Sequence, residues 1–476
     1  DVGHENAILI HVTLIPYLKA SGEMKTKPTQ ASVKELQGIG IQPDVIVCRS
    51  EHPLTTEIKD KIALFCNVPS SHVLQNLDVE YLYEAPLAME KENLAQVVCE
   101  SLHLPCPEPD LSDWTHMVEA LRHPNKEVTI ALVGKYIQLH DAYLSVVEAL
   151  KHGGIASHAN VHLKWVDSEL VTEENVAEYL SDVDGVLVPG GFGNRGIEGM
   201  ITAIRYAREN KIPFLGLCLG MQLTIVEYAR NVLGYHDAHS IEMNPNTMHP
   251  VIALMPDQNG VEDIGGTLRL GSYPCVLDKK SKAYALYGTE LINERHRHRF
   301  EINNHYRDDF TSHGMMISGQ SPDGHIVEMI ELPDHPFYVG IQAHPELKSR
   351  PNHAHPLFAG FVESAEEQGV LRRAKKLLMK RNHLSEPEAH RYFVTHFEAD
   401  PDQLSKVVFQ GASDDRGTVY LNGKAAVKIN GWAIPAVNEN LKSLLVKGKN
   451  TLAVDAFNVG GGSGFLGELN LVGKDG

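Results

Sequence analysis

Short apolar runs that alternate with longer helical segments dominate residues 127–370. Four of these runs have the length and apolar content of buried strands, at 128–133, 161–166, 185–188 and 213–217. Helical stretches separate them, at 141–152, 197–209 and 219–230. Strand–helix alternation of this kind predicts an α/β domain whose parallel sheet carries helices on both faces.

The residues before this region also have a mixed α/β pattern. Their strand pattern lies at 44–48, and their helical patterns lie near 32–37 and 55–65. We assign residues 1–106 to this part. The proline-rich segment Pro105–Pro109 indicates a break, so we expect a linker over 107–126.

Beyond the α/β domain the pattern changes twice. A charged stretch with helical periodicity predicts a helical connector at 371–392. After it, residues 393–476 show short alternating runs, such as 418–421 and 451–454, between turn signals such as Asn422-Gly423. We therefore expect a small all-β sandwich at the end of the chain.

Composition and charge narrow the class of protein. The 476 residues predict roughly three domains at about 150 residues each. The formal net charge of −18 argues against a general nucleic-acid or membrane-surface binder. Six cysteines are too few for a disulfide scaffold, and no apolar run approaches the ~18 residues of a membrane span. Because no signal-peptide pattern is present, we expect a cytoplasmic protein.

The segment Gly216–Gly220, with the sequence GLCLG, has the pattern of a nucleophile elbow with cysteine in place of serine. An apolar strand leads into it, a helical pattern follows, and the two glycines permit a sharp turn at Cys218. The helix N-terminus favours the reactive thiolate, and the amide of Leu219 would point into an oxyanion hole. A buried cysteine between two chance glycines fits the segment equally well when it is taken alone.

The triplet HPE at 344–346 supplies the partners that a cysteine nucleophile needs. Residues two apart face the same side of an extended chain, so Glu346 could fix the tautomer of His344. His344 could then deprotonate Cys218. A lone histidine is also compatible with a structural or surface role.

The glycine-rich turn Pro189–Gly193 follows a predicted strand. It could offer a second oxyanion amide, from Gly191, or it could be a plain βα turn. The elbow, the HPE triplet and this turn occur in one predicted sheet and in a consistent chain order, so they support one another.

Together these motifs resemble class I glutamine amidotransferase domains, and the chain resembles CTP synthases over about residues 1–370. The segments that carry the second resemblance are Ser21–Gln30, Gly40–Asp44, Cys48–Ser50, Gly134–Tyr136, Asp141–Tyr143, Phe192–Gly199 and Arg295–Glu301. The resemblance implies that residues 1–106 are the C-terminal part of an amidoligase domain and that residues 127–370 are the amidotransferase.

The resemblance implies a reaction in two halves. The amidotransferase hydrolyses L-glutamine through a thioester, and the ammonia aminates UTP to CTP after ATP with Mg²⁺ has phosphorylated the uracil O4. Cys218 would be the nucleophile, His344 the base and then acid, and Glu346 its orienting partner. The residues that would hold glutamine and its oxyanion are Gly191, Leu219, Gln222, Glu242 and Arg299. Among them, Arg299 suits the α-carboxylate.

The resemblance also assigns residues to three nucleotides. The UTP/CTP site would comprise Lys25, Thr26, Lys27, Pro28, Thr29, Gln30 and Lys61. Lysines and hydroxyls at this density suit a triphosphate, although an ordinary basic surface turn is the alternative. ATP would contact Leu77, Asp78 and Val79. The activator GTP would act on the loop with Arg195, Gly196 and Glu198.

The chain departs from the family pattern at its beginning. It contains no match to the phosphate loop G-x-x-x-x-G-K-[ST], and it opens with Asp1 rather than Met. We therefore expect an N-terminal truncation that removes the phosphate loop and the Mg²⁺ ligands. No covalently bound cofactor is expected, and CTP synthesis by this chain alone is not expected either.

The end of the chain departs as well, as an unrelated C-terminal extension. Segments Val419–Lys424 and Leu444–Val454 resemble galactose-binding-like β-sandwich modules of carbohydrate-active enzymes. Trp432 could be a sugar-stacking platform or a core or rim residue. Arg373–Glu386 slightly resembles the helical pair of small antitermination RNA-binding domains, with a solvated connecting helix as the alternative.

Two classes of function therefore stay open. The first is a glutamine-hydrolysing enzyme of the CTP synthase type, which the family implies to be a homo-oligomer with no nucleic-acid or membrane partner. The second is a catalytically silent scaffold that carries a carbohydrate- or partner-binding β-sandwich. A glutaminase assay separates the two, because the scaffold predicts no activity.

Overall fold

A computed structural model describes residue 3 and residues 6–254, 269–381, 389–413, 415–431, 435–458 and 465–474. The chain forms two compact units. The first unit comprises residues 1–125, 154–160 and 349–354, and the second comprises the remainder.

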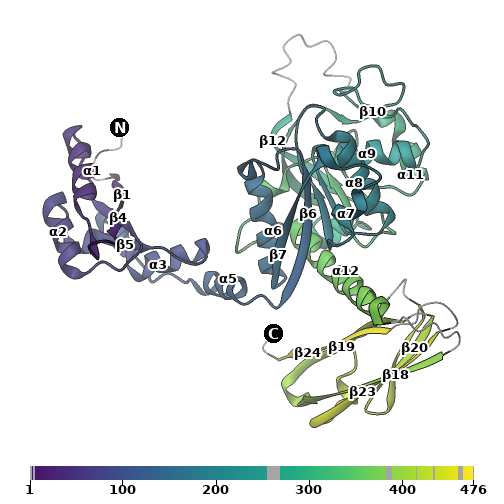
Figure 1. Cartoon of the computed structure of the whole chain (residues 1–476). Helices are drawn as coiled ribbons and strands as arrows, with labels where there is room; N and C mark the ends of the chain where they lie inside the picture. The colour runs from purple at the N-terminus through teal and green to yellow at the C-terminus, as the bar shows by residue number, and fades with distance from the viewer. Residues whose placement is uncertain are drawn as a thin grey trace. The chain divides into compact units, whose positions relative to one another are not determined.

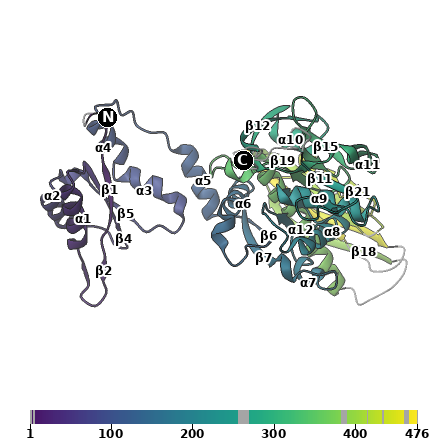
Figure 2. The same ribbon diagram turned by 90° about the horizontal axis from the view of Figure 1, so that it is seen from above.

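The first unit is built on a parallel sheet in the order β1-β4-β5. Helices α1 and α2 pack on one face, where Val33 and Ile62 are buried, and α3 and α4 lie on the other, where Val97 is buried (Figure 2). The elements are β1 (Ile10–Leu14), β2 (Tyr17–Leu18), β3 (Glu23–Met24), α1 (Lys27–Gly38), β4 (Val45–Ser50), α2 (Thr56–Cys66), β5 (Val73–Leu77), α3 (Ala85–Lys91), α4 (Leu94–Ser101) and α5 (Ser112–Arg122).

Helix α5 lies within the stretch 107–126 that we expected to be a linker. It is amphipathic, and Met117 and Val118 on its apolar side are buried against Ile155. The proline-rich break is therefore short, because the residues after it carry a helical hydrophobic stripe that needs a partner.

The second unit contains a large mixed sheet in the order β13-β12-β15-β16-β17-β9-β8-β6-β7, nine strands among the described residues (Figure 1). Its predicted strands are present as β6 (Lys126–Gly134), β7 (Ala159–Asp167), β8 (Gly185–Val188) and β9 (Phe214–Leu217). Strands β6, β8, β9 and β17 (Tyr338–Ile341) run parallel.

Helices cover both faces of this sheet, as the sequence predicts. Val186 and Val188 pack with α8 (Ile197–Glu209) and α9 (Leu219–Asn231) in one apolar cluster. On the opposite face, a Cβ at Gly185 would touch Phe361 of α12 (Pro356–Arg381). The remaining helices are α6 (Leu144–Ala156), α7 (Val176–Leu180), α10 (Lys282–Tyr287) and α11 (Arg307–Ser312).

One half of the sheet is antiparallel, an addition to the parallel strands that the sequence predicts. The added strands are β12 (Arg269–Leu277), β13 (Leu291–His298), β15 (Met316–Gln320) and β16 (Val327–Glu331). A separate small sheet contains β10 (His239–Ser240), β11 (Pro250–Ala253) and β14 (Glu301–Ile302).

The end of the chain forms two antiparallel sheets with one shared apolar core, the sandwich that its sequence predicts. Its strands are β18 (Ala389–Ala399), β19 (Leu404–Ser413), β20 (Arg416–Leu421), β21 (Lys424–Ile429), β22 (Ala436–Asn438), β23 (Gly448–Asn458) and β24 (Phe465–Gly473). Asn422 and Gly423 both have positive φ, as a tight hairpin turn between β20 and β21 requires. Trp432 lies outside the described residues.

The expected end of the amidotransferase at residue 370 falls inside α12, which runs without a break to Arg381. Arg372, beyond that limit, ion-pairs at 2.6 Å with the fully buried carboxylate of Asp184. The α/β domain therefore uses the helix past residue 370. Among the described helices, none combines the length and the apolar character needed to span a bilayer.

Candidate active site

Cys218 sits at a sharp turn between β9 and α9. Its φ of +51° lies outside the helical and strand regions, and its backbone N–H donates to Ile341 O at 2.7 Å. The flanking glycines are required by close packing: a Cβ at Gly220 would lie 2.2 Å from Val188 O, and one at Gly216 would lie 2.9 Å from Gly220. The GLCLG segment is thus a strained elbow rather than a chance cysteine between glycines.

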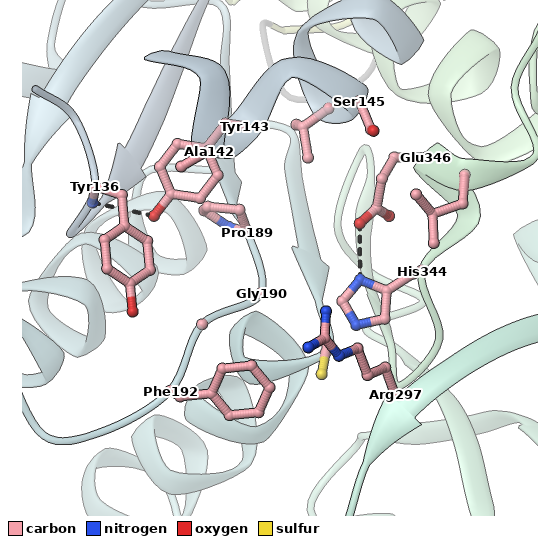
Figure 3. A pocket seen from close by; sticks show the side chains of 14 residues that line it. Tyr136, Ala142, Tyr143, Ser145, Pro189, Gly190, Phe192, Arg297, His344 and Glu346 are labelled. Carbon is pink, nitrogen blue, oxygen red and sulfur yellow. Dashed lines mark hydrogen bonds and ion pairs between the residues drawn. The ribbon is translucent and has the colours of Figure 1, made fainter. Parts of the chain in front are cut away.

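His344 follows β17 and is hydrogen-bonded to Glu346. Its Nδ1 lies 2.7 Å from Glu346 Oε1 (Figure 3), and His344 and Cys218 line the same cavity. Burial by itself would lower the pKa of His344, but the bonds to Cys218 and Glu346 outweigh burial and raise that pKa to about 10.

The segment that carries His344 is held against β13. The His344 N–H donates to Arg295 O at 2.7 Å. Further along, the buried carboxylate Glu294 Oε1 accepts from His355 Nε2 at 3.0 Å and from Lys348 Nζ at 3.3 Å. Burial would raise the pKa of Glu294, but the bond from His355 and the charge of Lys348 keep it below its ordinary value.

The glycine-rich turn after β8 is fixed by a lysine that sequence reasoning did not single out. Lys135, at the end of β6, donates from Nζ to Phe192 O at 2.9 Å and to Gly193 O at 2.6 Å. Burial and the neighbouring charge of Arg195 lower the pKa of Lys135 to about 8. Gly190 has no room for a side chain, since its Cβ would lie 2.9 Å from His344 Cε1.

Two cavities adjoin Cys218. One, of about 310 Å³, is lined by Tyr136, Phe192, Arg297, His344 and Glu346 among others (Figure 3). The other, of about 270 Å³, is lined by residues that we predicted to hold glutamine and its oxyanion: Gly191, Leu219, Gln222, Glu242 and Arg299. Burial raises the pKa of Glu242, against the charges of Lys135 and Arg299. Basic and acidic groups thus face one small cavity beside the thiol.

The predicted uridine-nucleotide residues lie around the start of α1, with mixed exposure. Lys27 is exposed, and Thr26 occupies the N-cap position of α1 without a side-chain capping bond. The Thr29 hydroxyl donates to Thr13 Oγ1 at 3.0 Å and is buried, so it is turned into the sheet. Lys61 is exposed on α2.

The other predicted nucleotide residues have partners within the chain. At the end of β5, which closes with Leu77, Asp78 ion-pairs with Arg49 at 2.7 Å, and Val79 follows it. Arg195 pairs with Glu169 at 2.7 Å, and Glu198 pairs with Arg230 at 2.8 Å. Gly196 precedes α8 with a φ of +68° and leaves no room for a Cβ beside Ser168.

Two further residues at the site were missed by sequence reasoning. Arg297 lines both cavities, and its alternation with His296 and His298 along β13 is a period-two signal that could have placed it on one face. Gln342 is fully buried beside Cys218, and no local pattern marks it.

Within the described ranges, no three His, Cys, Asp or Glu side chains are grouped as a metal site would need.

Comparison with known proteins agrees with this geometry. Residues 138–364 match the family described as glutamine amidotransferase class-I, and residues 1–104 match the family described as CTP synthase N-terminus. The fold and the site thus define a class I glutamine amidotransferase.

Relatives that match 77% of this chain narrow the class of protein. A CTP synthase of Clostridium beijerinckii is 58% identical over 368 residues, which cover 77% of this chain and 69% of that protein. A CTP synthase of Clostridium perfringens is 60% identical over 365 residues, with 77% and 68% covered. The glutaminase domain of Trypanosoma brucei CTPS with bound acivicin is 36% identical, covers 50% of this chain and 94% of that chain, and has a TM-score of 0.48. The chain belongs to the CTP synthase family.

Proposed function

We propose that this chain hydrolyses L-glutamine at Cys218, with His344 and Glu346 as the other members of a catalytic triad. The observation that carries the proposal is that Cys218 and His344, the latter hydrogen-bonded to Glu346, line one cavity, and that a second cavity with charged walls adjoins the thiol. Such an arrangement activates a thiol by moving its proton to an oriented imidazole.

The chemistry follows from this arrangement. The Cys218 thiolate attacks the γ-carbonyl carbon of glutamine, and the backbone amides of Gly191 and Leu219 would stabilise the oxyanion. When the C–N bond breaks, protonated His344 gives its proton to the departing ammonia. Water, deprotonated by the same imidazole, then hydrolyses the thioester and restores the thiol.

The charged walls of the cavity suit the ends of the substrate. We propose that Arg299 binds the α-carboxylate and that Glu242 faces the α-ammonium group. Gln222 donates from Nε2 to Phe300 O at 2.9 Å, which fixes its side chain at the cavity wall. The site would then select an amino acid that has a free α-carboxylate, a free α-ammonium group and a γ-amide.

We further propose that the ammonia serves ATP-dependent amination of UTP to CTP, as the family name of the relatives implies, when a phosphate loop is supplied from outside these 476 residues. The nucleotide residues around α1, β5 and the loop before α8 would bind UTP or CTP, ATP and GTP, and the chain would form a homo-oligomer.

We propose three domains: residues 1–106, the amidotransferase from residue 127 and the sandwich from residue 393. The amidotransferase then extends to at least Arg381, since α12 is continuous.

The first test labels the six thiols with a glutamine-analogue electrophile and follows each by mass spectrometry. Cys218 should react fastest and in parallel with loss of glutaminase activity. Burial raises the pKa of three competing thiols, those of Cys48, Cys66 and Cys275, which leaves them less reactive. Preferential labelling of exposed Cys106, or no glutaminase activity at all, would favour the silent scaffold that carries a binding sandwich.

The second test isolates the synthetase half. Incubated with UTP, MgATP and free ammonia, these 476 residues should form no CTP, because the sequence contains no phosphate loop. Ammonia bypasses Cys218, so the result does not depend on the amidotransferase. Nucleotide analysis by chromatography measures it, and ATP-dependent CTP formation would contradict the expectation.

A further inference from the structure

Gln342 is a fully buried side chain that links the reactive sulfur to the wall of the glutamine cavity. Its Nε2 lies 3.6 Å from Cys218 Sγ, and its Oε1 lies 3.3 Å from Gln222 Nε2. Its own backbone N–H donates to Glu328 O at 2.9 Å, which holds the residue at the end of β17.

The hydrogen-bond network fixes which end of the Gln342 amide faces the sulfur. Phe300 O is a carbonyl and can only accept, so the group of Gln222 that meets it at 2.9 Å is the NH₂. The second hydrogen of that NH₂ points at Gln342, which must present its oxygen in return. The NH₂ of Gln342 is therefore left to face Cys218.

We infer that Gln342 stabilises the attacking thiolate of Cys218 by donating an N–H to its sulfur, an inference that rests on the proposed role of Cys218. A donor to the charged form of a buried group favours that form over the neutral one. The Gln342 amide would donate to the sulfur while it is a thiolate, before it attacks glutamine, and again when the sulfur leaves the thioester during hydrolysis.

The same amide connects catalysis to the substrate pocket. Because Gln222 lines the glutamine cavity, the orientation of Gln342 depends on a residue that the substrate touches. A residue needed only for packing would not require this polarity, since an apolar side chain of the same length fills the space without partners.

The test is the pH dependence of Cys218 alkylation by iodoacetamide, which needs no substrate. Gln342→Met removes both polar ends at nearly constant volume. We expect its alkylation rate at neutral pH to fall about 10- to 100-fold, with the pH midpoint moved upward and the rate at high pH unchanged. Gln320→Met, the same change on β15 outside the site, should keep the parent profile.

A second variant keeps the inference decidable if Gln342→Met fails to fold. Gln342→Glu has the same shape, and its carboxylate would repel the thiolate, so alkylation should slow as that group ionises. A folded Gln342→Met or Gln342→Glu protein with the parent pH profile overturns the inference. If Cys218 of the parent chain is itself unreactive while other thiols label, the proposed function fails first, and the inference falls with it.

Discussion

Replacing Cys218 by alanine should reduce glutamine hydrolysis to the uncatalysed background, a loss of more than about 10⁴-fold. The variant retains the elbow, the cavity and the imidazole, but it has no atom that can form the thioester. Ammonia release from glutamine measures the rate. Cys106→Ala, which removes an exposed thiol, is the matched control and should retain the parent rate. Residual turnover near that of the parent would exclude a covalent mechanism at Cys218.

Glu346→Gln should give a smaller loss with a different signature. Two hydrogen bonds raise the pKa of His344 to about 10, so the protonated imidazole persists until the pH passes that value. The substitution removes the Glu346 carboxylate, which is one of these two causes, so the pKa of His344 should fall. The alkaline limb of kcat/KM should then move toward neutral pH. The raised pKa also stabilises the fold below about pH 6.5, and this contribution is lost as the pH rises through about 10.

The elements around Cys218 were predictable because their signals are local. Apolar runs mark β6, β8 and β9. The paired glycines of GLCLG mark the elbow, because close backbone packing there leaves no room for a side chain at either glycine. The HPE triplet likewise places its two functional residues within one short segment. In each case, residues that lie close together in the sequence also lie close together in the fold.

The antiparallel half of the sheet escaped prediction for a physical reason. Beside Ile292, the buried face of β13 carries Glu294, His296 and His298, so hydrophobic alternation gives little strand signal. The two histidines are tolerated inside because they bond each other and lie beside the carboxylates Glu328 and Glu301, which pair with Arg269. Such pairing is visible only after the chain has folded.

Gln342 and Lys135 escaped prediction because their partners are remote in sequence. Gln342 meets Cys218 from 124 residues away, and Lys135 meets Gly193 from 58 residues away. Each is a single polar residue at the end of an apolar run, which no periodicity distinguishes. The sequence likewise gives no sign that the Thr29 hydroxyl donates to Thr13.

Gly220→Ala should unfold or distort the amidotransferase, whereas Gly38→Ala should not. A methyl at Gly220 would lie 2.2 Å from Val188 O, and backbone atoms cannot yield as a flexible side chain can. We expect at least about 3 kcal/mol of destabilisation, together with loss of Cys218 alkylation because the helix N-terminus moves.

Gly38 provides the matched control because it is also helical and nothing lies within 4 Å of its added Cβ. Alanine there should be neutral or stabilise by about 0.5 kcal/mol, since it restricts the unfolded chain. Thermal unfolding followed by near-ultraviolet circular dichroism, with alkylation of Cys218 as a local probe, measures both variants. If Gly220→Ala melts at the parent temperature and its thiol reacts at the parent rate, the close approach of α9 to β8 is not what sets the elbow. The strain at Cys218 would then have to come from its hydrogen bond to Ile341.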